Sequence, residues 1–294
     1  MKNLHLVGLL RPQQWLKNLI VFLPVFFSGN LFDVACLKAA AGIFMTFCMM
    51  SSAVYCLNDL LDAEADRRHP VKCKRPVAAG DVSERTALLM AGALALLSVI
   101  VSLYLPVNNP PATAALLTAY ALLNAAYCLR LKRYAIVDVF TIASGFVLRL
   151  VAGGVGCSIW LSPWMVCLTF LLSLFLAFAK RRDDVLLSEQ KGIIARPNIV
   201  RYNLPFLNQV LSIIGTATIV CYILYTVSPE VMERMDCEYV YTTSVFVLAG
   251  ILRYLQITMV DLNSGSPTKI LLKDRFIHCC LSGWGLLFAA IIYL

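Results

Sequence analysis

The sequence carries a run of acidic side chains directly after an apolar segment, between Asn58 and Asp66. Asp59, Asp62 and Asp66 follow Asn58 at intervals of one, three and four residues, so on a continuing helix the four side chains project from one side. Carboxylates in this arrangement repel one another, and a hard, hydrated Mg²⁺ held by carboxylates and substrate phosphates relieves the repulsion. The alternative is a solvated acidic helix end balanced by the two arginines that follow. The run therefore predicts a magnesium site formed by Asp59, Asp62 and Asp66.

Basic side chains interrupt the apolar sequence at several points, and we expect some of them to bind phosphate. Ligands with several phosphate groups bring more negative charge than helix termini alone can neutralise. The candidates for this role are Lys17, Lys132, Lys180, Arg149 and Arg181. Membrane topology alone is the alternative explanation for any single loop cation.

Arg149 differs from the loop cations because it lies 11 residues beyond Asp138 in an apolar segment. On a helix this corresponds to ~16 Å along the axis. A charge at that depth costs roughly 2.5–3.5 kcal/mol on insertion scales unless it faces a polar cavity. A phosphate-binding or acid-pairing role is therefore favoured for Arg149, and a structural ion pair is the alternative.

The segments that must position these residues have the composition of a membrane protein. Residues of the types AVILMFWYC make up 60% of the 294 residues, and charged residues make up only 14%. The mean hydropathy is +0.77, which is far above that of a soluble domain. The fold class predicted is all-α, a multi-pass membrane helical bundle in a single domain over residues 1–294.

About nine apolar segments are long enough to cross the hydrocarbon of a bilayer as helices. They fall near residues 18–36, 39–57, 86–105, 112–129, 135–156, 160–179, 208–228, 239–258 and 277–294. Basic residues concentrate in the even-numbered loops, so these loops and the N-terminus are expected on the cytoplasmic side of a bacterial inner membrane, with the C-terminus in the periplasm.

Several other kinds of site are not indicated. The formal charge of +8 is better explained by orientation in the membrane and by anionic lipid than by nucleic acid. Most of the 11 cysteines lie in or beside apolar segments without ligand spacing, as packing residues do. The three histidines have no partner at the spacing of zinc or haem ligands, and nucleotide-binding and hydrolase motifs are missing.

The acidic run, its place after the second apolar segment and a second acidic loop after the sixth resemble the UbiA superfamily of intramembrane prenyltransferases. That resemblance implies a Mg²⁺–diphosphate site at the cytoplasmic mouth of the bundle. Within the superfamily, five further segments resemble a branch that transfers phosphoribose. They lie at residues 11–18, 127–132, 146–154 and 179–184, and at Ser266-Pro267-Thr268 with 271–275.

The branch resemblance implies transfer of 5-phosphoribose from phosphoribosyl diphosphate to a polyprenyl phosphate lipid. It implies catalytic roles for Asp59, Asp62, Lys132 and Lys180, and substrate-binding roles for Lys17, Asn58, Tyr127, Arg149, Arg181 and Asp184. The chain departs from the pattern where a Glu is expected after the Lys-Arg pair. Asp183 and Asp184 stand there instead, so either acid could be the functional one.

Two other functions fit parts of the sequence. Prenyl transfer from a prenyl diphosphate to an aromatic acceptor would use the same acidic run, but it needs fewer cations than this chain has. A transporter usually carries intramembrane acids near the midplane or broken helices, whereas these carboxylates lie at a helix end.

Overall fold

The computed structural model describes residues 2–68, 71–191, 197–262, 270 and 272–294, and every regular element in these ranges is helical. Eight of the helices are long and apolar enough to cross a membrane. The predicted all-α membrane fold is therefore confirmed. The expected number of about nine spans agrees approximately with the eight such helices in the described residues. Backbone contacts divide the chain into two units, Met1–Leu161 and Ser162–Leu294.

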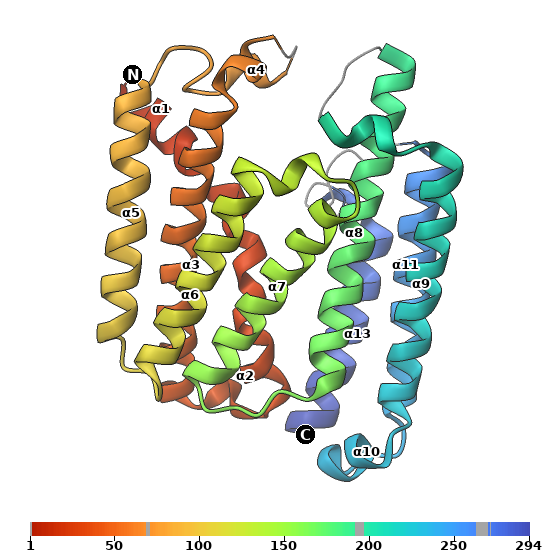
Figure 1. The fold of residues 1–294 in the computed structure, drawn as a ribbon. Helices are drawn as coiled ribbons and strands as arrows, with labels where there is room; N and C mark the ends of the chain where they lie inside the picture. The colour runs from red at the N-terminus through yellow and green to blue at the C-terminus, as the bar shows by residue number, and fades with distance from the viewer. Residues whose placement is uncertain (1, 69–70, 192–196, 263–269, 271) are drawn as a thin grey trace. The chain divides into compact units, whose positions relative to one another are not determined.

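The first unit is built around α3, which packs against α5, α6 and the 3-10 helix η1 (Figure 1). Its core joins side chains from η1, α3, α6 and α7, including Val21, Phe47, Leu117 and Ala152. The unit contains, in order, α1 (Lys2–Leu10), η1 (Pro12–Phe22), α2 (Leu23–Phe27), η2 (Asn30–Phe32), α3 (Val34–Leu61), α4 (Ala63–Arg67), η3 (Lys72–Lys74), α5 (Glu84–Tyr104), α6 (Pro110–Leu129), η4 (Leu131–Arg133) and α7 (Val137–Gly156).

The first predicted span, residues 18–36, is not one continuous helix. It is divided among η1, α2, η2 and the beginning of α3. Pro24 lacks the N–H that a continuing helix would use, and Gly29 adopts a left-handed conformation with φ 78°. Asp33 then begins α3 as a cap, accepting a hydrogen bond of 2.8 Å from the backbone N–H of Ala35. The apolar pattern located this segment but not its breaks.

A glycine allows η1 to lie directly against α7. A Cβ atom added at Gly153 would clash with the backbone carbonyl of Val21 and would lie 3.0 Å from its carbon. Since a backbone group cannot move aside as a flexible side chain can, only glycine fits at this crossing. The close approach places η1, with Lys17 and Asn18, beside the C-terminal half of α7.

In the second unit α8 packs against α9, α9 against α11, and α11 against α13. Phe175 of α8 meets Tyr254 of α11 edge to face, with ring centroids 5.5 Å apart. Asn203 caps α9, and Asp274 caps α13, through hydrogen bonds to backbone N–H groups three residues further on. The unit contains α8 (Pro163–Lys191), η5 (Pro197–Arg201), α9 (Leu204–Thr226), α10 (Pro229–Met235), η6 (Val240–Thr243), α11 (Ser244–Met259) and α13 (Arg275–Tyr293).

Candidate functional site

The acidic run lies where α3 passes into α4. Asp62 is the residue between the two helices, yet the backbone hydrogen bonds continue across it, from Asp62 N to Asn58 O at 2.9 Å and from Asp66 N to Asp62 O at 2.8 Å. The four polar side chains therefore stay on a nearly continuous helical path. For this reason the spacing of these four residues in the sequence brings their side chains near one another in the structure.

Asp59 is the most buried of these acids, with 1% of its surface exposed. Its Oδ1 atom forms ion pairs with Arg11, and with Arg75 at 3.3 Å. Its Oδ2 atom is buried, and none of the residues that the structure describes gives it a hydrogen bond. Both ion pairs of this carboxylate are therefore formed by the same oxygen atom. The other oxygen differs from most buried polar atoms, which are nearly always hydrogen-bonded.

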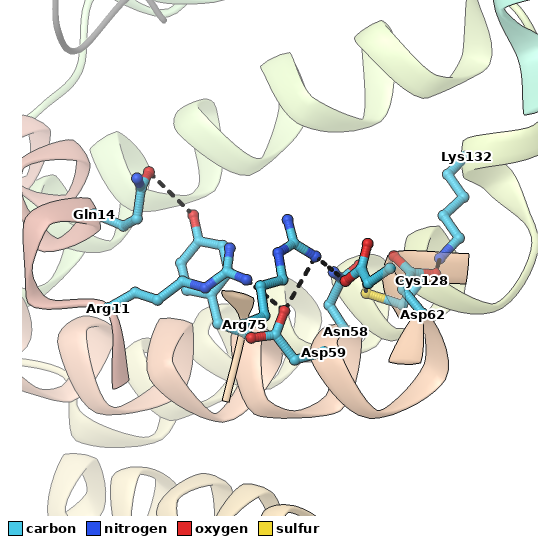
Figure 2. Close-up of polar contacts among 10 residues, drawn as sticks. Arg11, Gln14, Asn58, Asp59, Asp62, Arg75, Cys128 and Lys132 are labelled. Carbon is cyan, nitrogen blue, oxygen red and sulfur yellow. Dashed lines mark hydrogen bonds and ion pairs between the residues drawn. The ribbon is translucent and has the colours of Figure 1, made fainter. Parts of the chain in front are cut away.

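Arg75 joins Asp59 to Asp66. Figure 2 shows its guanidinium between two carboxylates, and the Nη1 atom lies 2.5 Å from Oδ2 of Asp66. Asp66 is itself buried, with 4% of its surface exposed. Carboxylates from α3 and α4 thus converge on a single nitrogen.

Lys132 forms an ion pair with Asp62, as Figure 2 shows. It comes from η4, which directly follows α6, so the loop after α6 is brought against the end of α3. Beside this pair, the Cys128 thiol lies 3.5 Å from Oδ1 of Asn58. Tyr127, the neighbour of Cys128 on α6, is half-buried. The predicted combination of Asp62, Lys132 and Asn58 is therefore assembled in one place.

Two arginines of this site were not among the residues predicted from the sequence. Arg11 precedes Pro12 and adopts φ 51°, and its guanidinium lies 5.0 Å from the ring centre of Tyr55. Arg75 follows a cluster of basic residues that orientation in the membrane also explains. The available signal was the pairing of each arginine with a following proline, which places both at the start of a turn or helix.

The structure gives Arg149 a set of neutral partners. Its Nε atom donates to Asn18 Oδ1 at 2.7 Å, Nη1 to the Gly145 carbonyl at 2.9 Å, and Nη2 to the Tyr120 hydroxyl at 2.6 Å. The guanidinium also lies against the rings of Tyr120 and Phe146. None of these hydrogen-bond partners is an acid. Arg149 is 7% exposed, and its hydrogen bonds link α7 to α6 and to η1. Lys17, which precedes Asn18 in η1, is half-buried.

The second unit holds the other predicted residues near the C-terminal end of α8. Arg181 is fully buried and lies 3.2 Å from Oδ2 of Asp184, which is 8% exposed. Arg182, which was not predicted, donates to Asn208 Oδ1 at 2.7 Å and to the Thr258 carbonyl at 2.6 Å. Lys180 is half-buried beside them. This part of α8 is therefore a buried charged segment that also ties α9 to α11.

A second charged pair in this unit joins α11 to the cap of α13. Arg253 Nη2 lies 2.8 Å from Oδ2 of Asp274, and donation from this guanidinium holds the pKa of the Asp274 carboxyl below its usual range. The motif residues Ser266, Pro267 and Thr268 lie outside the described residues.

The acids of the first unit lie beside arginine and lysine side chains. In the described residues, no three His, Cys, Asp or Glu side chains form a group ready to hold a metal ion. The acids Asp59, Asp62 and Asp66 are instead paired with cations. The atoms available are nonetheless carboxylate oxygens, which Mg²⁺ prefers, and within the described ranges no hydrogen-bond partner meets the buried Oδ2 atom of Asp59.

Comparison with known proteins places these residues in context. The model of the UbiA prenyltransferase family matches residues 19–279. The decaprenyl-phosphate phosphoribosyltransferase of Mycolicibacterium smegmatis is 36% identical, over 99% of this chain and 94% of that protein. The protein of that name from Corynebacterium glutamicum is 32% identical, over 100% of this chain and 89% of its own length.

Solved structures show the same fold. A UbiA homolog from Archaeoglobus fulgidus, bound to GPP and Mg²⁺, superimposes with a TM-score of 0.73 and covers 99% of this chain and 100% of its own. A digeranylgeranylglyceryl phosphate synthase gives a TM-score of 0.66 over 100% of this chain and 99% of its own. Their identities to this chain are 20% and 17%, so the likeness concerns the fold alone.

Proposed function

Because this chain belongs to the UbiA prenyltransferase family, we propose that it transfers 5-phosphoribose from phosphoribosyl diphosphate to a polyprenyl phosphate. The observation that supports the proposal most directly is that three carboxylates and three cations form ion pairs where α3 ends. The chain that holds them is similar over 99% of its length to a decaprenyl-phosphate phosphoribosyltransferase. We take residues 1–294 as a single transmembrane domain of this family, and we keep Lys17, Asn58, Tyr127, Arg149, Arg181 and Asp184 as proposed substrate-binding residues.

The proposed cofactor is Mg²⁺, held by oxygens of Asp59, Asp62 and Asp66. When bound, the ion would neutralise charge on the departing diphosphate and so make it a better leaving group. The A. fulgidus structure with Mg²⁺ supports a divalent metal in this fold. The carboxylates of this chain provide hard oxygen ligands, which Mg²⁺ prefers.

The protein's own side chains supply positioning and positive charge. Lys132 lies beside Asp62, where its ammonium can bind a phosphate oxygen of the donor, and Lys180 is the second lysine to which we assign this role. The acceptor phosphate is already anionic, so its oxygen can attack the anomeric carbon without a strong general base. Catalysis then rests on orientation of the two substrates and on stabilisation of the leaving diphosphate.

We also propose the orientation of the chain in a bacterial inner membrane, with the N-terminus cytoplasmic and the C-terminus periplasmic. The basic loops that contain Arg75, Lys132 and Arg201 support it, because such loops are retained on the cytoplasmic side. A topology reporter fused after Leu294 is expected to read periplasmic, and one inserted after Lys132 cytoplasmic. The reversed pattern would contradict this orientation.

The donor is tested directly with purified protein. Label from ribose-labelled phosphoribosyl diphosphate is expected to enter an organic-extractable polyprenyl phosphate product, with about one diphosphate released per product. A direct displacement by the phosphate oxygen also inverts the anomeric configuration. Chelation of divalent metal is expected to stop labelling and diphosphate release together.

Two outcomes of the same assay would reject the proposal. Consumption of a prenyl diphosphate in the presence of an aromatic acid, without use of the phosphoribosyl donor, would make the chain a prenyltransferase. Inactivity with both donors, together with cation-coupled solute uptake into liposomes, would indicate a transporter.

A further inference from the structure

The carboxylate of Asp59 is paired on one side only. Oδ1 forms ion pairs with both Arg11 and Arg75, whereas Oδ2 is buried and has no hydrogen-bond partner in the described part of the chain. An unpaired buried carboxylate oxygen is strongly unfavourable, because neither water nor a donor compensates for its lost hydration. Oδ2 is therefore the atom of this carboxylate that is available to a further ligand.

Arg75 lies where a bridging cation would meet two of the acids. Its Nη1 atom is 3.3 Å from Oδ1 of Asp59 and 2.5 Å from Oδ2 of Asp66, so oxygens from α3 and α4 converge on one positive group (Figure 2). Without that charge the two buried carboxylates would repel each other. Arg75 thus performs the electrostatic work that a divalent cation would perform for the same pair.

Arg75 is also the partner that can move. Its side chain is 23% exposed, whereas those of Asp59 and Asp66 are 0% and 5% exposed. Its backbone is extended at the end of the three-residue helix η3, and the acids are held by α3 and α4. A rotation of the arginine side chain toward solvent therefore disturbs little packing, while movement of either acid would disturb a helix.

We propose that Arg75 is a placeholder for the divalent cation. In the structure its guanidinium holds Asp59 and Asp66 together; a bound cation would take the place of the guanidinium between these two carboxylates, with both acids staying where α3 and α4 hold them. The released guanidinium then binds phosphate oxygens of the incoming diphosphate, which its planar donors match in geometry. The inference rests on the proposed function in taking Asp59 and Asp66 as metal ligands and a diphosphate as part of the donor.

Arg11 does not share this role. Its guanidinium lies over the Tyr55 ring at 5.0 Å, and its backbone joins α1 to η1. It is therefore held in place by an aromatic contact besides its ion pair. Arg11 can keep one charge beside Asp59 while Arg75 exchanges partners.

The test measures metal and diphosphate affinities separately in the Arg75→Gln variant. Electron paramagnetic resonance measures the affinity for Mn²⁺ in the absence of substrate. Because the competing guanidinium is gone, this affinity is expected to rise about tenfold. Because a phosphate ligand is lost, binding of inorganic diphosphate in saturating Mg²⁺ is expected to weaken about tenfold. The two affinities should therefore change in opposite directions.

Arg68→Gln is the matched control, because it removes the same charge from a nearby pair with Glu64 whose side chains are 80% and 81% exposed. It should leave both affinities within about twofold. Arg75→Lys keeps the charge but loses the planar guanidinium. Its affinities for Mn²⁺ and for diphosphate should lie between those of the wild type and of Arg75→Gln. If Arg75→Gln does not fold in metal-free buffer, the lysine variant supplies the comparison.

The failure modes are distinguishable. Mn²⁺ binding that requires Asp59 but does not tighten when Arg75 is replaced would overturn the placeholder role and leave the metal site intact. Weakening of both affinities together would also overturn it, since a merely structural arginine has that effect. Mn²⁺ binding that is undetectable in the wild type and all variants would reject the proposed metal site itself.

Discussion

Asp59→Asn is expected to lower Mg²⁺-dependent turnover by roughly a thousandfold or more. The substitution removes the anionic ligand whose Oδ2 atom is buried without a partner, while the amide can still accept hydrogen bonds from Arg11 and Arg75. Loss of a catalytic metal's charge stabilisation costs several kcal/mol, and each 1.4 kcal/mol is about tenfold in rate. The measurement is steady-state transfer of labelled phosphoribose at saturating Mg²⁺.

Glu64→Gln provides a control of the same chemical change a few residues away. Glu64 is exposed and pairs with Arg68 at the surface, so activity should stay within about twofold of wild type. Unaltered gel-filtration elution and helical circular dichroism of Asp59→Asn would show that the protein still folds. Retention of more than about a tenth of the activity would place the metal elsewhere than at Asp59.

Arg149→Met is expected to lower thermal stability in detergent by roughly 10 °C, the largest stability effect among the substitutions considered. Three hydrogen bonds disappear, and the buried Asn18 Oδ1 atom and Tyr120 hydroxyl lose the donor that they share in Arg149. Each unpaired buried group costs about 1–3 kcal/mol, and 1 kcal/mol corresponds to about 2–4 °C for a domain of this size. Thermal unfolding followed by intrinsic fluorescence measures the change.

Two further variants separate structure from substrate binding at this position. Arg130→Met changes an exposed arginine and should alter the midpoint by less than about 2 °C. Arg149→Lys keeps the charge but cannot reach three acceptors in three directions, so it should recover little stability. If Arg149→Met melts like the wild type, the structural role is contradicted; a raised KM for the donor in either variant would support the substrate-binding role that we propose for the same residue.

The apolar segments and the acidic run could be predicted well from the sequence, because each depends on local pattern. Segment length and hydropathy located the helices, and the spacing of Asp59, Asp62 and Asp66 placed them on a common helical path. The pairing of Asp62 with Lys132 also joins residues that were both predicted to act. The catalytic and metal roles of these residues stay predictions.

The partners that come from distant segments could not be predicted. Arg11 reaches Asp59 across 48 residues of sequence, and Arg149 reaches Asn18 across 131. Such contacts depend on how helices pack, which hydropathy does not encode. The same limit applies to Arg149: the sequence shows a buried charge, whereas its neutral acceptors on Asn18 and Tyr120 come from the packing of η1 and α6 against α7. The substrate-binding role of Arg149 stays a prediction.

The pairing of three carboxylates with three cations near the end of α3 has a consequence for the order of binding. Asp59, Asp62 and Asp66 carry as much formal charge as Arg11, Arg75 and Lys132, so these groups together are electrically neutral. A divalent ion alone would leave two uncompensated positive charges in a weakly polarisable environment, and a diphosphate alone would leave excess negative charge. Each ligand therefore raises the affinity for the other by the same factor. The proposed enzyme should take up phosphoribosyl diphosphate most readily as its magnesium complex, and it should release magnesium and diphosphate together.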